Sequence, residues 1–227
     1  MFDKVLIANR GAIACRITRT LRNMSVSPVA VYSQADAHSL HVTAADQAVL
    51  LGESLATDTY LDTGRIFDAA QRTGAQAIHP GYGFLSENAA FAEECAAHGI
   101  VFIGPEPRHM RDFGLKHTAR KLAEASGMPL LPGTGLLDDL DHALNEAEVI
   151  GYPVMLKSTA GGGGIGMQLC DNAAALTDAF DSVRRLSRNN FSNAGIFLEK
   201  YVRDARHVEV QIFGDGRGKV IALGERD

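Results

Sequence analysis

Short apolar runs alternate with segments of helical spacing through the first half of the chain. The runs fall at residues 4–8, 29–32, 48–51, 75–79 and 101–105, and each reads as a strand. Continuous apolar strands are typical of a parallel sheet that is buried on both faces. Apolar residues recur at helical spacing between the runs, so we predict helices over 12–24, 39–45, 63–73 and 88–98. This alternation predicts a doubly wound α/β domain that ends near residue 112.

The second half continues the alternation and then changes character. Helices are expected over 115–126, 138–150 and 172–186, with strands at 152–156, 167–170 and 196–200. Residues 207–213 alternate with period two, which predicts a strand with one buried and one polar face. A turn at 214–216 and a return strand at 219–223 complete a hairpin. The chain stops just after this strand, and we therefore expect a fragment of a longer polypeptide.

The stretch after the 152–156 strand carries the strongest chemical signal. Lys157 ends the strand, and four consecutive glycines follow at 161–164. Glycine N–H groups can approach an anion closely, and the lysine supplies a cation beside them. The order does not fit the G-x-x-x-x-G-K-[ST] loop, because the lysine precedes the glycines. We predict a mobile lid over nucleotide phosphates, with a ligand-free surface hairpin as the alternative.

Two further segments lie where α/β sheets place ligands. The 79–88 loop, HPGYGFLSEN, follows a predicted strand and is expected to form a ligand crevice or a tight structural turn, with Ser86 capping the next helix. Arg10 follows the first strand and is expected either to hold an anion or to form a structural ion pair. His38 and His41 have a metal-compatible spacing, but no cysteine or carboxylate set accompanies them.

Composition and charge narrow the class of protein. The 227 residues are 46% hydrophobic and 22% charged, with a net charge of −5. This balance argues against a general binder of nucleic acid or anionic membranes. No segment is apolar enough to span a membrane, and the three cysteines lack a C-x-x-C spacing. We expect a cytoplasmic protein with reduced thiols.

Seven segments together resemble the biotin carboxylase component of biotin-dependent carboxylases. They are IANRG at 7–11, HPGYGFLSEN at 79–88, FIGP at 102–105, the lysine and glycines at 157–167, EKY at 199–201, RHVEVQ at 206–211 and GERD at 224–227. They occur in the family's order and at its spacing along the whole chain. Within the family, three details resemble urea carboxylase, the biotin-dependent part of urea amidolyase. Acyl-CoA and pyruvate carboxylases usually carry Glu, Asp and Arg where this chain has Ala12, Leu115 and Ile165.

The resemblance implies an ATP-grasp architecture built on the α/β domain. Residues 1–112 would form the N-terminal Rossmann-like, pre-ATP-grasp domain, 113–203 a helical linker with the ATP-grasp lid, and 204–227 the first strands of a truncated ATP-grasp catalytic domain. The residues implied at ATP are Lys116, Lys157, Gly163, Gly164, Glu199, Lys200, Tyr201, Val202 and His207. Tyr82 and Gly83 are implied at a biotin or bicarbonate crevice.

Each implied role suits the chemistry of its residue. Lys116 and Lys157 are point cations for phosphate oxygens, and Gly163 and Gly164 offer backbone N–H donors. Glu199 would accept a hydrogen bond from the adenine amino group. The backbone of 200–202 would read the ring edge, and His207 would reach the ribose or a phosphate.

The implied reaction uses ATP, Mg²⁺ or Mn²⁺, bicarbonate and biotin held on a carrier domain elsewhere. The catalytic residues and metal ligands are expected beyond residue 227, so the fragment alone is expected not to turn over. A carboxyltransferase domain would pass the carboxyl group to urea, giving allophanate, and a homo-oligomer is expected. The alternatives are an acyl-CoA or pyruvate carboxylase, another ATP-grasp ligase, and a non-catalytic nucleotide-binding module.

Overall fold

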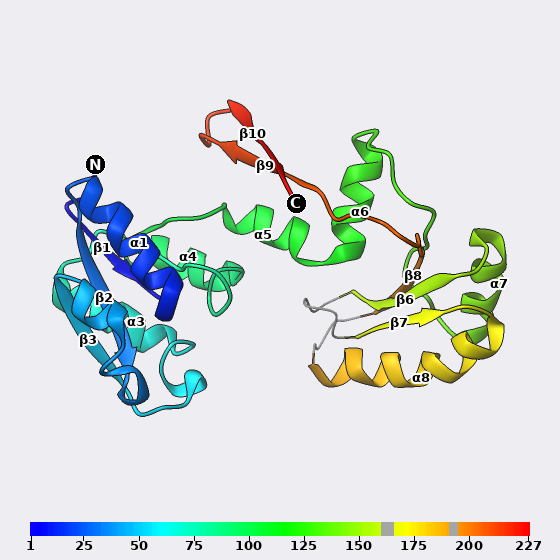
Figure 1. Ribbon diagram of the computed structural model, residues 1–227, viewed down its shortest axis with the longest axis horizontal. Helices are drawn as coiled ribbons and strands as arrows, with labels where there is room; N and C mark the ends of the chain where they lie inside the picture. The colour runs from blue at the N-terminus through cyan, green and yellow to red at the C-terminus, as the bar shows by residue number, and fades with distance from the viewer. Residues whose placement is uncertain (160–165, 191–194) are drawn as a thin grey trace. The chain divides into compact units, whose positions relative to one another are not determined.

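The computed structural model describes residues 1–159, 166–190 and 195–227 (Figure 1). The chain forms two compact units, Met1–Leu122 and Ala123–Asp227. Among the described residues, no helix combines the length and the apolar character needed to cross a bilayer.

The first unit is built on a five-stranded parallel sheet of order β3-β2-β1-β4-β5. Its strands are β1 (Lys4–Ile7), β2 (Ser27–Ser33), β3 (Gln47–Gly52), β4 (Ala77–His79) and β5 (Val101–Phe102). Its helices are α1 (Gly11–Asn23), α2 (Leu40–Ala44), α3 (Thr63–Thr73), α4 (Ala89–Ala97) and α5 (Pro107–Gly114), with short 3-10 turns at Gln34–Asp36 and Ala56–Asp58. Helix α6 (Lys116–Ala125) follows and crosses the boundary between the two units.

Strand β1 shows why the sheet is buried on both faces. Leu6 belongs to the core cluster that contains side chains of α3 and α4. Val5 and Ile7 belong to a second cluster, formed with α1. Successive side chains of a strand point to opposite faces, so a continuous apolar run is needed to fill both layers. The doubly wound α/β prediction for this region is therefore confirmed.

The ends of the helices follow local capping chemistry, and here the sequence prediction needs two corrections. Asn88 caps α4 by accepting a hydrogen bond from the Phe91 N–H at 3.0 Å, so the expected cap at Ser86 is wrong. The carboxamide of Asn88 is next to the first helical turn, whereas the Ser86 N–H is used in a turn with the Gly83 carbonyl at 2.9 Å. Helix α5 was not predicted, although proline at its first position is a recognised helix start.

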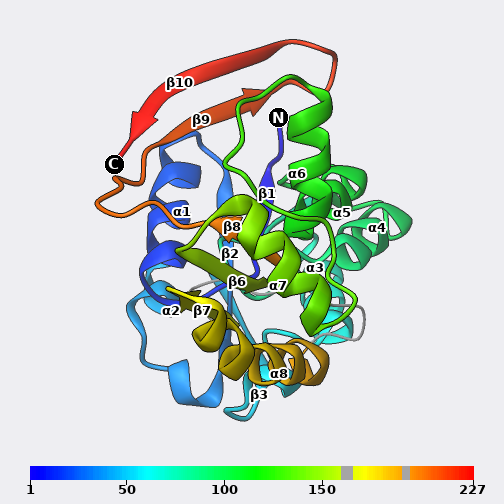
Figure 2. The same ribbon diagram turned by 90° about the vertical axis from the view of Figure 1, so that its right-hand side faces the viewer.

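The second unit contains an antiparallel sheet of order β7-β6-β8, with α7 and α8 packed against it (Figure 2). The elements are α7 (Leu140–Ile150), β6 (Val154–Ser158), β7 (Met167–Cys170), α8 (Ala173–Asn190) and β8 (Ile196–Lys200). Val154, Leu156 and Leu198 are fully buried in one cluster with side chains of both helices. One face of this sheet is thus the core of the unit.

The remaining strands, β9 (Glu209–Gly214) and β10 (Val220–Arg226), form a two-stranded antiparallel hairpin. The alternating pattern predicted one buried face, and this is wrong for the described structure. Val210, Ile212 and Phe213 are 50%, 53% and 64% exposed. An alternating strand buries its apolar face only against a second layer, and among the described residues this hairpin forms a sheet of its own.

Candidate functional site

The sheet of the second unit has a face directed away from α7 and α8. Strand register places Lys157 opposite Met167 and Phe197. The same register places Met155 opposite Leu169 and Glu199. Residues that are directly opposite in an antiparallel pair share a face. This sheet face therefore carries one cation and one carboxylate among the apolar side chains Met155, Met167, Leu169 and Phe197.

Lys157 and Glu199 form an ion pair on this face, between the lysine Nζ and the glutamate Oε2. They are diagonal neighbours across β6 and β8, within reach of long side chains. Their side chains are 23% and 21% exposed, so the pair is partly shielded and still reachable from solvent. A lysine ammonium has three N–H donors, and Glu199 needs only one of them. The remaining donors can meet an anionic ligand.

The end of β8 is tied to the chain segments beside it. The Lys200 Nζ donates to the carbonyls of Gly151 and Tyr152 at 2.8 and 2.9 Å. The Lys200 N–H donates to the Pro132 carbonyl at 2.8 Å, and the Tyr201 N–H donates to the Pro153 carbonyl at 3.1 Å. These bonds fix the strand end. They also commit the Lys200 ammonium to backbone carbonyls.

The other predicted nucleotide contacts lie in other segments of the chain. Lys116 is the first residue of α6 and belongs to the first unit. His207 is exposed in the segment before β9, and Val202 is 44% exposed. Gly163 and Gly164, with the predicted lid, lie outside the described residues. The structure thus brings together Lys157, Glu199 and the end of β8.

In the first unit, the sheet order places β1 between β2 and β4. Strands β2 and β3 are added on one side of β1, and β4 and β5 on the other, so the strand order reverses between β1 and β4. Ligand crevices of open α/β sheets form at the carboxyl ends of the strands on either side of such a point. Asn9 follows β1 and the 80–88 loop follows β4. The Asn9 Nδ2 donates to the carbonyls of Pro80 and Tyr82, both at 2.8 Å. The side chain of Tyr82 is 66% exposed.

Arg10 takes the structural alternative among its two predicted roles. Its guanidinium pairs with Asp36 at 3.0 Å and lies over the Tyr60 and Phe84 rings, 5.3 and 5.7 Å from their centroids. Burial works to raise the pKa of Asp36, but hydrogen bonds from Tyr60, Arg10 and Ser33 outweigh it and the pKa is lowered. Burial, reinforced by the Asp36 hydrogen bond, raises the pKa of Tyr60 to about 12. The network therefore holds a charged carboxylate against a neutral phenol.

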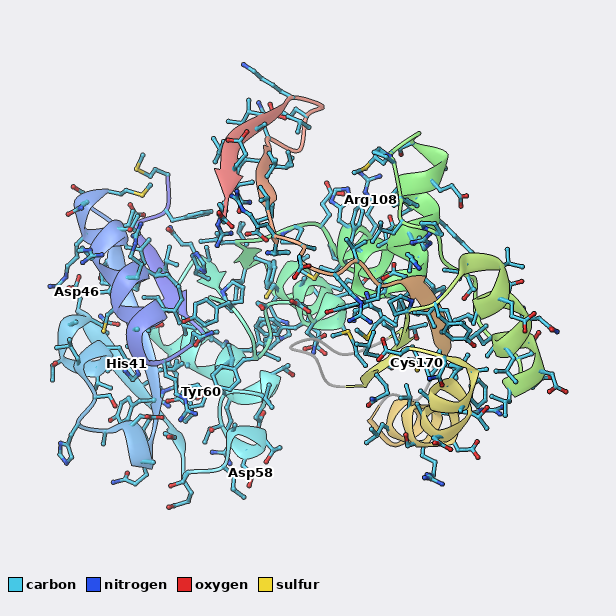
Figure 3. The ribbon with its side chains drawn as sticks, turned by 45° about the vertical axis from the view of Figure 1, so that its right-hand side comes forward. His41, Asp46, Asp58, Tyr60, Arg108 and Cys170 are labelled. Carbon is cyan, nitrogen blue, oxygen red and sulfur yellow. The ribbon has the colours of Figure 1, made fainter. Side chains whose placement is uncertain are left out.

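His41, which is labelled in Figure 3, also has a structural role. It is fully buried, with Nδ1 3.4 Å from the Gly11 N–H and Nε2 3.3 Å from the Val31 carbonyl oxygen. Burial lowers the pKa of its imidazole. Both ring nitrogens thus face backbone groups. Among the residues that the structure describes, no three His, Cys, Asp or Glu side chains gather as a metal-binding group.

Asn9 is the contributor to this region to which the sequence prediction gave no role. In the sequence it appears only within the IANRG segment at 7–11. A polar residue directly after a fully apolar strand, at the predicted crevice, is the signal that could have identified it.

Two family models match the chain in succession. Residues 1–110 match the N-terminal domain of biotin carboxylase, and residues 116–227 match the ATP-binding domain of the carbamoyl-phosphate synthase L chain.

Curated relatives are similar along the whole chain. Urea amidolyase of Saccharomyces cerevisiae is 52% identical over 227 residues, which is 100% of this chain and 12% of that protein. The mitochondrial methylcrotonoyl-CoA carboxylase subunit alpha of Oryza sativa subsp. japonica is 50% identical, covering 99% of this chain and 31% of that protein. Biotin carboxylase 2 of Bacillus subtilis is 48% identical, covering 100% and 51%. The chain thus spans between 12% and 51% of the length of these relatives.

Solved structures of biotin carboxylases are also similar to this chain. The biotin carboxylase of Campylobacter jejuni, in a β,γ-ATP complex, has a TM-score of 0.96 at 41% identity, covering 99% of this chain and 51% of that one. The biotin carboxylase domain dimer of Hydrogenobacter thermophilus 2-oxoglutarate carboxylase, in complex with MgADP, ADP and bicarbonate, has a TM-score of 0.94 at 42% identity, covering 99% and 50%.

Proposed function

Because the chain belongs to the biotin carboxylase family of ATP-dependent ligases, we propose that it binds ATP for the bicarbonate-dependent carboxylation of biotin. The observation that carries this proposal is the Lys157–Glu199 pair on an otherwise apolar sheet face. A nucleotide combines a flat, largely apolar ring with polar edges and an anionic tail. The sheet face supplies matching surfaces for each part.

In this proposal, Lys157 donates to phosphate oxygens through the N–H groups that Glu199 does not use. Glu199 accepts a hydrogen bond from the amino group of the adenine ring. Met155, Met167 and Leu169 share the face and can contact the ring. Methionine suits this role because its flexible, polarizable side chain adapts to a flat surface.

The remaining expected contacts stay part of the proposal. Lys116 and the backbone of Gly163 and Gly164 would hold phosphates, and His207 would reach the ribose or a phosphate. The N–H groups of Lys200 and Tyr201 already bind protein carbonyls, so we assign reading of the ring edge chiefly to Val202. Tyr82 and Gly83 would line the biotin or bicarbonate crevice.

Divalent metal neutralises developing charge during phosphoryl transfer. The described residues offer no cluster of three potential ligands that fits a metal site. We therefore assign no step to the metal within this chain. We propose that the metal ligands belong to a longer polypeptide, together with the catalytic residues, the biotin carrier domain and the carboxyltransferase domain. The 227-residue chain alone would bind nucleotide weakly and not turn over.

For the final acceptor we propose urea. Ala12, Leu115 and Ile165 support it, since acyl-CoA and pyruvate carboxylases usually carry the charged residues Glu, Asp and Arg at these three positions. Identity supports it less strongly, with 52% to a urea amidolyase against 50% to a methylcrotonoyl-CoA carboxylase subunit. An acyl-CoA acceptor is therefore the second candidate.

The test uses the biotinylated native polypeptide that carries this chain, with ATP, Mg²⁺ and bicarbonate. ADP release is followed with urea added and, separately, with acetyl-CoA or 3-methylcrotonyl-CoA. Stimulation by urea alone is the expected result. Stimulation by an acyl-CoA alone would leave biotin carboxylation standing and overturn the urea assignment. ATP cleavage that is independent of biotin and bicarbonate would contradict the proposed function.

A further inference from the structure

Asn9 uses every polar atom of its side chain to join two turns that are far apart in the sequence. It is 4% exposed and lies two residues beyond the end of β1. Its Nδ2 donates to the carbonyls of Pro80 and Tyr82 at 2.8 Å each, and its Oδ1 accepts from the Arg10 N–H at 2.9 Å. A carboxamide offers two N–H donors and one acceptor oxygen, so both donors are used and the oxygen accepts one hydrogen bond.

The loop is shaped to receive this side chain. Gly81 lies between the two bonded carbonyls with φ of +68°, and a Cβ there would lie 2.7 Å from the Asn9 Nδ2. The Gly81 N–H also donates to the His79 Nδ1 at 3.0 Å. The backbone of 80–82 is thus held at three successive residues. Glycine is required here because any larger residue would displace the carboxamide.

After Tyr82, the loop has unfilled space at Gly83 and is then held in place by a ring stack at Phe84. Gly83 has φ of +64°, and a Cβ added to it would meet nothing within 4 Å. Phe84 stacks on Tyr60, with ring centroids 5.1 Å apart and planes 7° from parallel. The exposed step from Tyr82 to Gly83 is therefore bracketed by Asn9 on one side and the Phe84–Tyr60 stack on the other. A backbone fixed on both sides loses little freedom when a ligand binds, which favours affinity.

We propose that Asn9 is a positioning residue that holds Tyr82 and Gly83 in the geometry that receives biotin. The inference rests on the proposed function, because biotin is the substrate assigned to this crevice. Asn9 acts through the loop backbone and needs no contact with the substrate. Replacing Asn9 should therefore lower kcat/KM for biotin and leave the KM for ATP unchanged. The principal ATP contacts in our proposal, Lys157 and Glu199, lie in the other unit.

The test compares Asn9→Ala and Asn9→Asp in the native polypeptide, without its biotin, with free biotin as the variable substrate. Asn9→Asp keeps the size of the side chain and the acceptor for the Arg10 N–H, but places a carboxylate oxygen against two carbonyl oxygens. Val29→Ala is the matched control, since Val29 is fully buried in β2 and not part of the loop. The melting temperature of each variant is measured, so that the Asn9 variants are compared with a control of similar stability loss.

Both Asn9 variants should lower kcat/KM for biotin by roughly 10- to 100-fold, as displacements of about 1 Å in positioning groups do. Their KM for ATP should stay within about twofold of the native value, because catalytic positioning and nucleotide binding use different groups. Val29→Ala should leave both KM values unchanged. Equal losses on biotin and ATP, or a normal kcat/KM for biotin in Asn9→Asp, would overturn the positioning role.

A second readout does not depend on activity. Amide hydrogen exchange in peptides covering 79–88 of the 227-residue chain should accelerate at least tenfold in Asn9→Ala and remain native in Val29→Ala. Native exchange in Asn9→Ala would overturn the claim that Asn9 holds the loop. A native enzyme with no biotin-dependent ADP release would instead contradict the proposed function and the biotin assignment, and the exchange measurement would still decide the loop.

Discussion

Two regions hold their polar groups differently: the β1–β4 corner, which consists of Asn9 and residues 80–82, and the sheet face that carries Lys157 and Glu199. At the corner, neutral groups on a 4% exposed asparagine bind two backbone carbonyls. On the sheet face, two charges pair while each side chain is more than 20% exposed. Buried neutral hydrogen bonds are costly to leave unmade, whereas a partly exposed ion pair exchanges partners with ions and water at small cost.

The difference indicates two functional strategies. The corner fixes one backbone geometry in advance, and in our proposal ligand binding there depends on the position of the loop. The sheet face keeps charge that can be redirected toward a ligand. Mutations at the corner should therefore alter stability and geometry, and mutations on the sheet face should alter ligand chemistry with little change in stability.

The largest expected effect is that of Lys157→Ala in the native polypeptide. Removing the cation that we propose stabilises phosphate charge should lower the rate of bicarbonate-dependent ATP cleavage by about 100- to 1000-fold. The free energy of unfolding should change by less than about 1 kcal/mol, because the ion pair is partly exposed. Lys219→Ala, at an exposed lysine of the β9–β10 turn, is the control and should leave the rate of ATP cleavage unchanged. ATP cleavage within about twofold of native in Lys157→Ala would favour a non-catalytic module.

Gly81→Ala should have the next largest effect, and on stability. The left-handed backbone and the clash with Asn9 together should cost about 2–3 kcal/mol of unfolding free energy. Gly74→Ala is the matched control, because Gly74 has φ of +69° with nothing within 4 Å of an added Cβ, and it should cost only about 1 kcal/mol. Denaturant unfolding of the chain measures both. Equal costs would mean that the loop yields to the added methyl group and that Asn9 does not constrain it.

A smaller effect is expected from pH. Burial lowers the pKa of both His41 and His79 below the ordinary 6.5. The unfolded chain then binds more protons than the folded chain in this range, so the stability contributed by the neutral rings is full above pH 6.5 and is lost as pH falls through the folded pKa values. The melting temperature at pH 5 should be several degrees below that at pH 7.

His79→Gln separates the two histidines in this experiment. Its side-chain oxygen can accept the Gly81 N–H without titrating, so the variant should show a weaker pH dependence than the native chain. Asp36 does not confuse the result, because its pKa is lowered below 3.8 and its contribution is lost only at more acidic pH. An unchanged melting temperature between pH 7 and pH 5 would show that neither ring is held neutral.

The smallest effect is expected from Glu199→Gln. Glutamine keeps an acceptor for the adenine amino group but loses the charge, so affinity for ATP should fall by less than about tenfold. Stability should change by less than about 1 kcal/mol. Calorimetric titration with ATP and GTP measures the affinity, and Glu225→Gln, at an exposed residue of β10, is the control. A loss larger than that of Lys157→Ala would place the dominant nucleotide contact at Glu199 instead.

The sequence predicted most of the first unit because its strands are apolar on both faces. All five predicted runs correspond to strands, and burial is most complete in β1 and β2, whereas Leu50 of β3 and Val101 of β5 are 46% and 49% exposed. The same reasoning failed for β9, whose alternation requires a covering layer that the described residues do not form. It also missed α5, which is only eight residues long and has Met110 and Phe113 as its large apolar side chains, too few to define a repeat.

By itself, then, the sequence determined the strands, most of the helices and the residue types of the candidate site. It identified Lys157 through a local pattern, a lysine at the end of an apolar strand before four glycines, and Glu199 through the family resemblance. Only the tertiary structure decided that the two share a face, because strand register depends on pairing across 42 residues. It alone joined Asn9 to Pro80 and Tyr82, across 71 and 73 residues. Local composition sets which groups are present, and long-range packing sets which of them meet.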